Sequence, residues 1–363
     1  TSLIFSEGWF HIKNMQTHYF FNVVIGFIYI WHMPLFFFIA GASSAYALKK
    51  RTAAQYRKER VYRLLIPLIF GIVLLIPPQS YFENIQKAGY GGSFLEFYPA
   101  FFNGLYPTGN LHWGHLWFLF YLFVFSLVLS GLVSALNLTE QNIRVHSFIT
   151  RLSERNNIFY LAVPLILIEF SLRWRFSGFQ TFITDWANVL HYLLLVIFGF
   201  LIYSSNLLVE TISQCKTKAL FAAIPCSIAF LVLIPISIPA FAEYRSDPSL
   251  QNFINHPEIL LFYILVMGFK VLAEWFWLIA ILGYARKYLS STGSIMQRLS
   301  RMAFPFYIFH QTIIISIGFF VVQYPLSIWL KYTIISLLAI PLTYACCELA
   351  KQQAITRFIF GIK

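Results

Sequence analysis

Residues 27–41 read FIYIWHMPLFFFIAG. The stretch is apolar enough to cross the hydrocarbon core of a bilayer, which takes about 20 mostly apolar residues in a helix. It nevertheless contains a histidine, His32, and two residues later a proline, Pro34. An imidazole is costly in hydrocarbon, and a proline removes a backbone hydrogen bond of the helix. Such residues are tolerated where they face protein or a water-filled cavity, so the stretch predicts a membrane helix that tilts or breaks at Pro34 beside a cavity.

The composition of the whole chain is that of a membrane protein. Of its 363 residues 59% are hydrophobic and only 11% are charged, whereas soluble domains carry about 25% charged residues. A net charge of +12 would suit a nucleic-acid-binding protein if the chain were soluble. Here the basic residues cluster between apolar runs, which indicates contact with a membrane surface and no nucleic-acid partner. The four cysteines show neither a disulfide pattern nor metal-ligand spacing, so we expect no metal site.

Nine apolar segments are long enough to span a bilayer. We expect them near residues 18–45, 61–80, 115–136, 157–173, 187–206, 219–240, 257–282, 303–323 and 325–348. Because a backbone in lipid must satisfy its own hydrogen bonds, these segments predict helices. The sequence therefore predicts an all-α fold, a polytopic bundle of membrane helices that forms a single domain over residues 1–363.

The basic residues predict how the chain is oriented. Most lysines and arginines lie in loops on one side of the predicted bundle, near residues 49–63, 144–155, 216–218, 286–301 and 351–363. The opposite side holds only Lys13, Lys87, Arg173, Arg175 and Arg245. The positive-inside rule then places the C-terminus in the cytoplasm and residues 1–17 outside. A chain that begins outside, at Thr1, leads us to expect one further helix upstream, which would bring the total to ten.

One connecting segment on the outer side, at about residues 81–113, is large enough to have structure of its own. It is rich in aromatic residues and is interrupted by several glycines and prolines. We expect this outer loop to fold onto the membrane surface or to dip into it.

Three arginines follow one another at three-residue steps on the predicted cytoplasmic side, in the stretch YRKERVYRLLIP. On an α-helix, Arg57, Arg60 and Arg63 would share one face. Guanidinium groups bind phosphate oxygens through two hydrogen bonds at once, so these residues are candidates for binding a phosphorylated cofactor. The alternative is that they anchor the protein to anionic lipid headgroups.

Five histidines lie in or near the predicted spanning segments: His32, His112, His115, His191 and His310. An ionisable residue in a membrane is a candidate for function, although a neutral imidazole can also simply join two helices by hydrogen bonds. His310 follows Pro305 and precedes Gln311, as His32 adjoins Pro34. Two histidines near helix-breaking prolines indicate a cavity.

The stretch HWGHLWFLFYL begins the third predicted helix at its outer end. His112, Trp113, His115 and Trp117 would lie at the outer interface, either as an ordinary aromatic belt or as a rim that binds sugar or lipid. Elsewhere, the four-residue spacings of Lys270 with Glu274 and of Glu169 with Arg173 predict two helical ion pairs.

Four phrases in this order, HMPLFFFIAG, RKERVYRLLIP, HLWFLFYL and FPFYIFHQTIII, resemble the acyltransferase 3 family of integral membrane acyltransferases. The outer loop before HLWFL is most similar to the branch of glucan biosynthesis protein C. The resemblance spans nearly the whole chain. It implies ten spanning helices and a protein of the bacterial cytoplasmic (inner) membrane.

The resemblance also implies a reaction, the transfer of an acetyl or succinyl group from cytoplasmic acyl-CoA to a hydroxyl of a periplasmic or surface glycan. Acyl-CoA would be the donor substrate, with no bound cofactor. The family's R-x-x-R motif matches Arg60 and Arg63, and Arg57 has the same spacing one step earlier. The family's catalytic histidine, in its first helix, has no counterpart here and would lie upstream of this chain. His32, Tyr307 and His310 are then candidates to line the cavity.

The rival hypothesis is a transporter or flippase of a glycan or a lipid-linked substrate, with no acyl chemistry. Transporters also build their sites from broken helices and polar groups at the middle of the membrane. No paired interrupted segments occur in matching halves of this sequence, which favours the acyltransferase.

Overall fold

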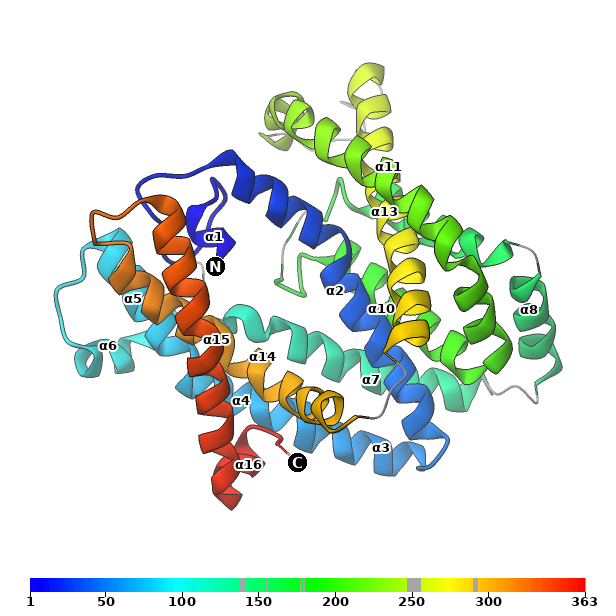
Figure 1. Ribbon diagram of the computed structural model, residues 1–363, viewed down its shortest axis with the longest axis horizontal. Coiled ribbons are helices and arrows are strands. Elements are labelled where there is room, and N and C mark those ends of the chain that lie inside the picture. The colour runs from blue at the N-terminus through cyan, green and yellow to red at the C-terminus, as the bar shows by residue number, and fades with distance from the viewer. Residues whose placement is uncertain are drawn as a thin grey trace. The chain divides into compact units, whose positions relative to one another are not determined.

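The described part of the chain folds as helices (Figure 1). The computed structural model describes residues 1–106, 108–136, 142–154, 156–176, 178, 180–246, 256–289 and 293–362, with side chains except at 237–246. No β-strand occurs in these described residues. The all-α prediction is therefore confirmed. Arg155, Lys363 and the Arg245 side chain, which enter the charge asymmetry, lie outside the described part.

The helices before the middle of the chain are α1 (Ser2–Phe5), α2 (Tyr19–Leu48), α3 (Ala53–Arg60), η1 (Val61–Leu65), α4 (Ile66–Leu74), α5 (Ile76–Ala88), α6 (Phe94–Phe101), η2 (Gly114–Leu116), α7 (Trp117–Ala135) and α8 (Ile143–Ser153). The later ones are η3 (Asn157–Leu161), α9 (Ala162–Leu172), α10 (Trp186–Ser204), α11 (Asn206–Ser246), α13 (Pro257–Tyr288), α14 (Ser294–Val321), α15 (Ile328–Gln352) and α16 (Ala354–Ile359).

Within the described residues, eight helices are long and apolar enough to cross a membrane. The count is nine if Ile143–Ser153 and Asn157–Leu172, which meet at 114°, form one bent span. The predicted segment at 157–173 corresponds to the second half of this pair, and the other eight predicted segments each overlap one spanning helix. The polytopic bundle is thus confirmed, but several helices are longer than predicted because polar turns extend them beyond their apolar parts.

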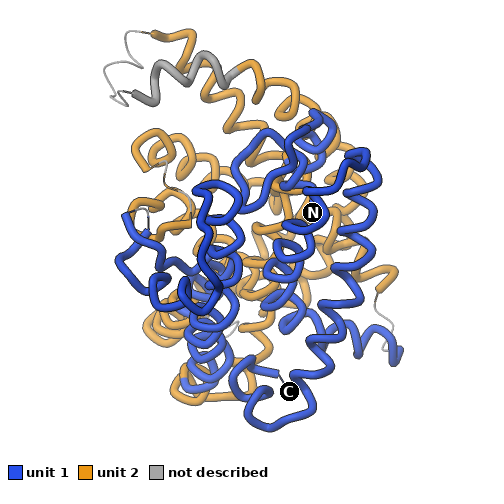
Figure 2. The backbone as a smooth tube through the Cα atoms, turned by 90° about the vertical axis from the view of Figure 1, so that its left-hand side faces the viewer, with its two compact units in different colours: residues 1–25, 58–123, 292–363 blue, residues 26–57, 124–291 orange. Residues whose placement is uncertain are grey.

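The chain divides into two compact units, each built from separate stretches of sequence (Figure 2). Unit 1 comprises residues 1–25, 58–123 and 292–363, drawn in blue. Unit 2 comprises residues 26–57 and 124–291, drawn in orange. We describe each unit by itself.

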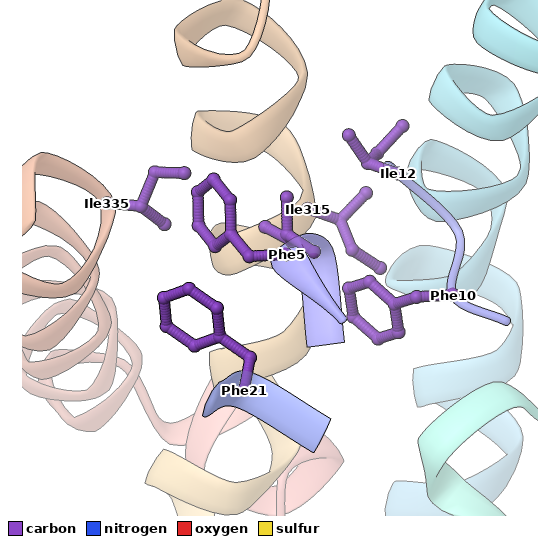
Figure 3. Close-up of a cluster of buried hydrophobic side chains, with 7 residues drawn as sticks. Phe5, Phe10, Ile12, Phe21, Ile315 and Ile335 are labelled. Carbon is purple, nitrogen blue, oxygen red and sulfur yellow. The ribbon is translucent and has the colours of Figure 1, made fainter. Parts of the chain in front are cut away.

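The first residues of the chain form part of the core of unit 1. Phe5, Phe10 and Ile12 are buried together with Phe21 at the start of α2. Figure 3 shows these side chains gathered beside Ile315 of α14 and Ile335 of α15.

Polar contacts hold the same segment in place. The buried Lys331 of α15 donates to Asn14 Oδ1 over 2.9 Å. Lys13 and Gln86 of α5 exchange two hydrogen bonds, of 2.8 and 2.9 Å, between backbone and side-chain amide. The segment before α2 is therefore fixed although it has little regular structure.

The predicted outer loop at 81–113 contains helical structure. Helix α5 ends at Gly89, whose φ of 65° is the left-handed conformation that glycine adopts without strain. Helix α6 begins with a capping box, in which Ser93 and Glu96 each accept a hydrogen bond from the other's backbone N–H. Phe97 and Phe101 of α6 then pack into the core of unit 1. The many aromatic residues of this segment are explained by this packing.

In unit 2, two helices approach each other so closely that their facing residues must be glycine. A Cβ atom on Gly41 of α2 would lie 2.0 Å from the carbonyl oxygen of Val196 in α10. A Cβ on Gly199 of α10 would lie 2.0 Å from the carbonyl oxygen of Phe38. Small residues allow such approach between membrane helices, where dispersion contacts drive association. Helix α2 itself continues through Pro34 without interruption.

We therefore expect Gly41→Ala and Gly199→Ala each to destabilise the protein by about 1–3 kcal/mol, because the added methyl group meets backbone that cannot move aside. Thermal unfolding in detergent measures this. Gly131→Ala in α7 is the matched control, since its Cβ would meet nothing within 4 Å. It should melt at or slightly above the wild-type temperature. Wild-type melting of Gly41→Ala would contradict the close approach.

Candidate functional site

Unit 1 contains a connected set of polar side chains among its apolar helices. Helix α5 supplies its centre, because Gln79, Glu83 and Lys87 recur every four residues and so share one face. Residues 9–13, the turn at 112–115 and helix α14 supply the rest. We call this set the histidine network, since it contains His11, His112, His115 and His310.

One contact of the network joins His11 to Glu83. His11 Nδ1 lies 2.6 Å from Glu83 Oε2, and Lys87 Nζ lies 2.8 Å from the other carboxylate oxygen. His11 is only 4% exposed. An ionised carboxylate only accepts hydrogen bonds, so Nδ1 carries a proton and donates it to Glu83. A carboxylate that holds Nδ1–H in this way fixes the orientation of the imidazole.

His112 lies against this pair with its ring stacked on that of His11, at a centroid distance of 5.9 Å. Its Nδ1 accepts a 2.9 Å hydrogen bond from the backbone N–H of Gly114, so its Nε2–H donates to Ser80 Oγ over 3.0 Å. Burial lowers the pKa of His112 to about 4, the nearby His11 acts in the same direction, and Glu83 opposes both. His112 is therefore a neutral ring at physiological pH.

This shift predicts an acid-sensitive contribution to stability. An unfolded histidine titrates near pH 6.5, so between about pH 6.5 and 4 the unfolded state binds a proton that the folded state does not. The free energy of unfolding falls as the pH is lowered through this window, and the contribution of His112 is fully present above it. Thermal melts from pH 7 to pH 4 should show a smaller loss for His112→Asn, whose amide oxygen can still accept from Gly114. Equal losses in both proteins would contradict this assignment.

Around Gln79 the network joins α5 to α14. Gln79 Nε2 donates to Thr312 Oγ1 over 2.7 Å and lies 3.4 Å from His115 Nδ1. His115 Nε2–H donates to the carbonyl of Ile308 over 3.0 Å, and the Tyr307 hydroxyl donates to the backbone carbonyl of His115. Both Gln79 and His115 are buried. These groups satisfy one another and fix the two helices and the 112–115 turn together.

His310 lies at the edge of the network. Its Nδ1–H donates to the carbonyl of Tyr307 over 2.6 Å, and its ring meets that of His115 edge-on at 5.3 Å. Because a carbonyl only accepts, Nε2 of the neutral ring carries the lone pair. In the described part of the chain no side chain or backbone group hydrogen bonds to this Nε2. His310 is thus available to accept a proton or a hydrogen bond.

The network includes four of the residues that the sequence singled out: His112, His115, Tyr307 and His310. The two tryptophans of the predicted rim pack elsewhere in unit 1. Trp113 stacks on Phe120 at 5.0 Å, and Trp117, 5% exposed, meets Tyr121 edge-on. His32 belongs to unit 2, where its Nδ1–H donates to the carbonyl of Ile28, one turn earlier in α2.

The arginine motif starts in a regular helix and ends in a wider turn. Arg57 is exposed on α3, whereas Arg60 and Arg63 are half-buried. Arg63 lies in the π-helical stretch η1, and its Nε is 2.9 Å from Glu59 Oε1. A π-helical turn rotates less per residue than an α-helical one. The α-helical geometry that would place all three arginines on one face therefore extends only as far as Arg60. Such turns occur frequently at functional sites.

Unit 2 holds a separate group of buried charges, which we call the Glu169 cluster: Glu169, Arg173, His191, Lys270 and Glu274. Arg173 binds Glu169 through two hydrogen bonds of 2.9 and 2.7 Å, so this predicted pair is present. The predicted pair of Lys270 with Glu274 is not. Lys270 lies 3.3 Å from Glu169, and Glu274 lies 2.6 Å from His191 Nε2. Contacts from α9 and α10 replace the pairing within α13.

Sequence spacing gave no sign of His11 and Glu83, which are 72 residues apart. The one indication in the sequence was the polar face of α5 (Gln79, Glu83 and Lys87), because buried polar side chains require polar partners. That face does not indicate that the partner is a segment without regular structure.

Comparison with known protein families shows that the model described as an acyltransferase domain, Acyl_transf_3, matches residues 4–348. Comparison with curated proteins found no match, and neither did comparison with solved structures.

Proposed function

We propose a reaction on the basis that the chain belongs to the acyltransferase 3 family. In this proposal, the protein transfers an acetyl or succinyl group from cytoplasmic acyl-CoA to a hydroxyl of an extracytoplasmic glycan. The family match over residues 4–348 makes the chain an acyltransferase. Its apolar helices make it an integral membrane protein. The match is the observation that carries the proposal. The donor, the acceptor, the bacterial inner membrane and the cytoplasmic C-terminus are our inferences.

The donor side of the proposal depends on Arg57, Arg60 and Arg63. Coenzyme A carries a pyrophosphate and a 3′-phosphate, and guanidinium groups bind such oxygens in pairs. The positive-inside rule places these arginines on the side where acyl-CoA is available. Arg60 and Arg63 are half-buried, and the ion pair with Glu59 holds the Arg63 guanidinium in one orientation.

The proposed reaction forms one bond and breaks one. The acceptor hydroxyl oxygen attacks the thioester carbonyl carbon, the C–O bond forms, the C–S bond breaks, and the hydroxyl proton ends on the thiol of coenzyme A. A histidine with a free lone pair can take that proton on the way. The family's catalytic histidine would lie upstream of this chain. Of the cavity candidates His32, Tyr307 and His310, we favour His310 as a hydrogen-bond acceptor in the site, because its Nε2 is in the acceptor state. The hydroxyl of Tyr307 is already engaged, because it donates a hydrogen bond to the backbone carbonyl of His115.

The test uses the full chain, purified and placed in lipid nanodiscs with acyl-CoA and a glucan oligosaccharide. We expect release of free coenzyme A thiol that depends on the oligosaccharide, together with an acyl ester on the sugar detected by mass spectrometry. Movement of the oligosaccharide across a vesicle membrane without thiol release would overturn the proposal in favour of transport.

A further inference from the structure

We propose that Trp9, His11 and Glu83 form a subsite that binds a neutral sugar ring, and that this subsite holds the glycan acceptor. The second clause rests on the proposed function. None of the three residues belongs to the arginine motif or to the candidates for proton transfer.

Trp9 provides the stacking surface. It is 63% exposed. It is nevertheless held in place, because Lys87 Nζ lies 4.6 Å from its ring centroid and the ring of His11 meets it edge-on at 4.9 Å. An indole that is both fixed and accessible leaves room for a ligand ring against it at little entropic cost.

His11 and Glu83 provide the polar contacts beside that surface. His11 Nε2 makes no hydrogen bond to any residue that the structure describes. Each carboxylate oxygen of Glu83 can accept a second hydrogen bond beside the ones it already has. Sugar hydroxyls both donate and accept hydrogen bonds, so they match both groups. His112, stacked behind His11 and fixed by Ser80, keeps the imidazole from turning.

The charges favour a neutral ligand over a phosphate group. Lys87 is paired with Glu83. Lys13 donates to the backbone carbonyls of Leu3, Ser6 and Gly8. Both nearby cations are therefore engaged, and the Glu83 carboxylate would repel a lipid phosphate.

The subsite is expected to lie beyond the hydrocarbon core. The helical run Ala53–Ala88 has 36 residues, which at 1.5 Å per residue is about 54 Å, against about 30 Å for the core of a bilayer. Its apolar part ends before Glu83, in the sequence YFENIQKA. By the positive-inside rule this end faces the outside, where an extracytoplasmic glycan is found.

The test measures binding of a short glucose oligosaccharide to the full chain by saturation-transfer NMR and titration calorimetry. Trp9→Ala removes the stacking surface. His11→Asn retains a donor to Glu83 and removes Nε2 together with the rest of the ring. We expect each to weaken binding about tenfold, a change of 1.4 kcal/mol, and to raise the KM for the acceptor without changing the KM for acyl-CoA. Trp186→Ala, which removes a 43% exposed tryptophan from unit 2, is the matched control and should bind as the wild type does.

Three outcomes separate the possibilities. Wild-type affinity in Trp9→Ala and His11→Asn would overturn the subsite, and tryptophan quenching by brominated lipids that disappears in Trp9→Ala would then identify Trp9 as a membrane anchor instead. Binding that depends on Trp9 in a protein that transfers no acyl group would support the subsite and refute the proposed function. If Trp9→Ala fails to fold, Trp9→Leu replaces it, and we expect the loss of the aromatic face to weaken binding in the same way.

Discussion

In a protein with both Arg60 and Arg63 replaced by alanine, acyl transfer is expected to fall at least a hundredfold while expression and folding stay normal. Each arginine would lose a charge-assisted hydrogen bond to a donor phosphate, worth about 1.5–3 kcal/mol. Two such losses correspond to at least about a hundredfold in kcat/KM. The defect should lie in the KM for acyl-CoA. Steady-state kinetics with each substrate varied in turn measure it.

Two comparisons separate phosphate binding from membrane anchoring. Lys58→Ala removes a positive charge from an exposed position of the same helix and should leave activity nearly unchanged. Replacing Arg60 and Arg63 by lysine keeps both charges and removes the planar fork, so phosphate binding should remain impaired. Full activity of the lysine variant would show that the arginines act only as charges at the membrane surface.

Glu169→Gln is expected to destabilise the protein by about 3–5 kcal/mol, because it leaves buried cations without their counter-charge. Glu169 has no exposed surface, and it binds Arg173 through two hydrogen bonds and faces Lys270. Breaking a buried ion pair from one side costs far more than the pair itself contributes. We expect the variant to lose its folded peak in fluorescence-detected size-exclusion chromatography, or to melt many degrees below the wild type.

Glu210→Gln is the matched control for this substitution. Glu210 also pairs with an arginine, Arg286 at 3.0 Å, but the two side chains are 51% and 43% exposed. Exposed pairs contribute about 0–1 kcal/mol, so this variant should melt close to the wild type. Equal destabilisation by the two substitutions would show that burial does not determine how much the Glu169 cluster contributes to stability.

The helices could be predicted from sequence because each apolar run is local information. Spacing also predicted the pair of Glu169 with Arg173, which are neighbours on a continuous helix. The same rule failed for Lys270 and Glu274. Glu169 reaches Lys270 from α9, and His191 reaches Glu274 from α10. The competing partners came from elements that are distant in sequence, and no spacing rule includes them.

The candidate site shows the same limit. His112, His115 and His310 stood out because a histidine in an apolar run requires a reason. His11 lies in a segment with no periodic pattern, and Glu83 lies on the polar end of a helix, where a carboxylate needs no explanation. Their contact follows from how the first residues of the chain pack against α5, α14 and α15, which is a tertiary arrangement.

The bond between Lys331 and Asn14, which are 317 residues apart, has a consequence for biosynthesis. Helix α15 leaves the ribosome long after the segment that it contacts. Contacts of such separation form only after the intervening chain has been made and inserted. The segment that bears Trp9 and His11 therefore lacks this partner until α15 has been synthesised. A chain stalled on the ribosome before α15 would contain every membrane helix of unit 2. Its proposed sugar subsite would still lack the contact between Asn14 and Lys331.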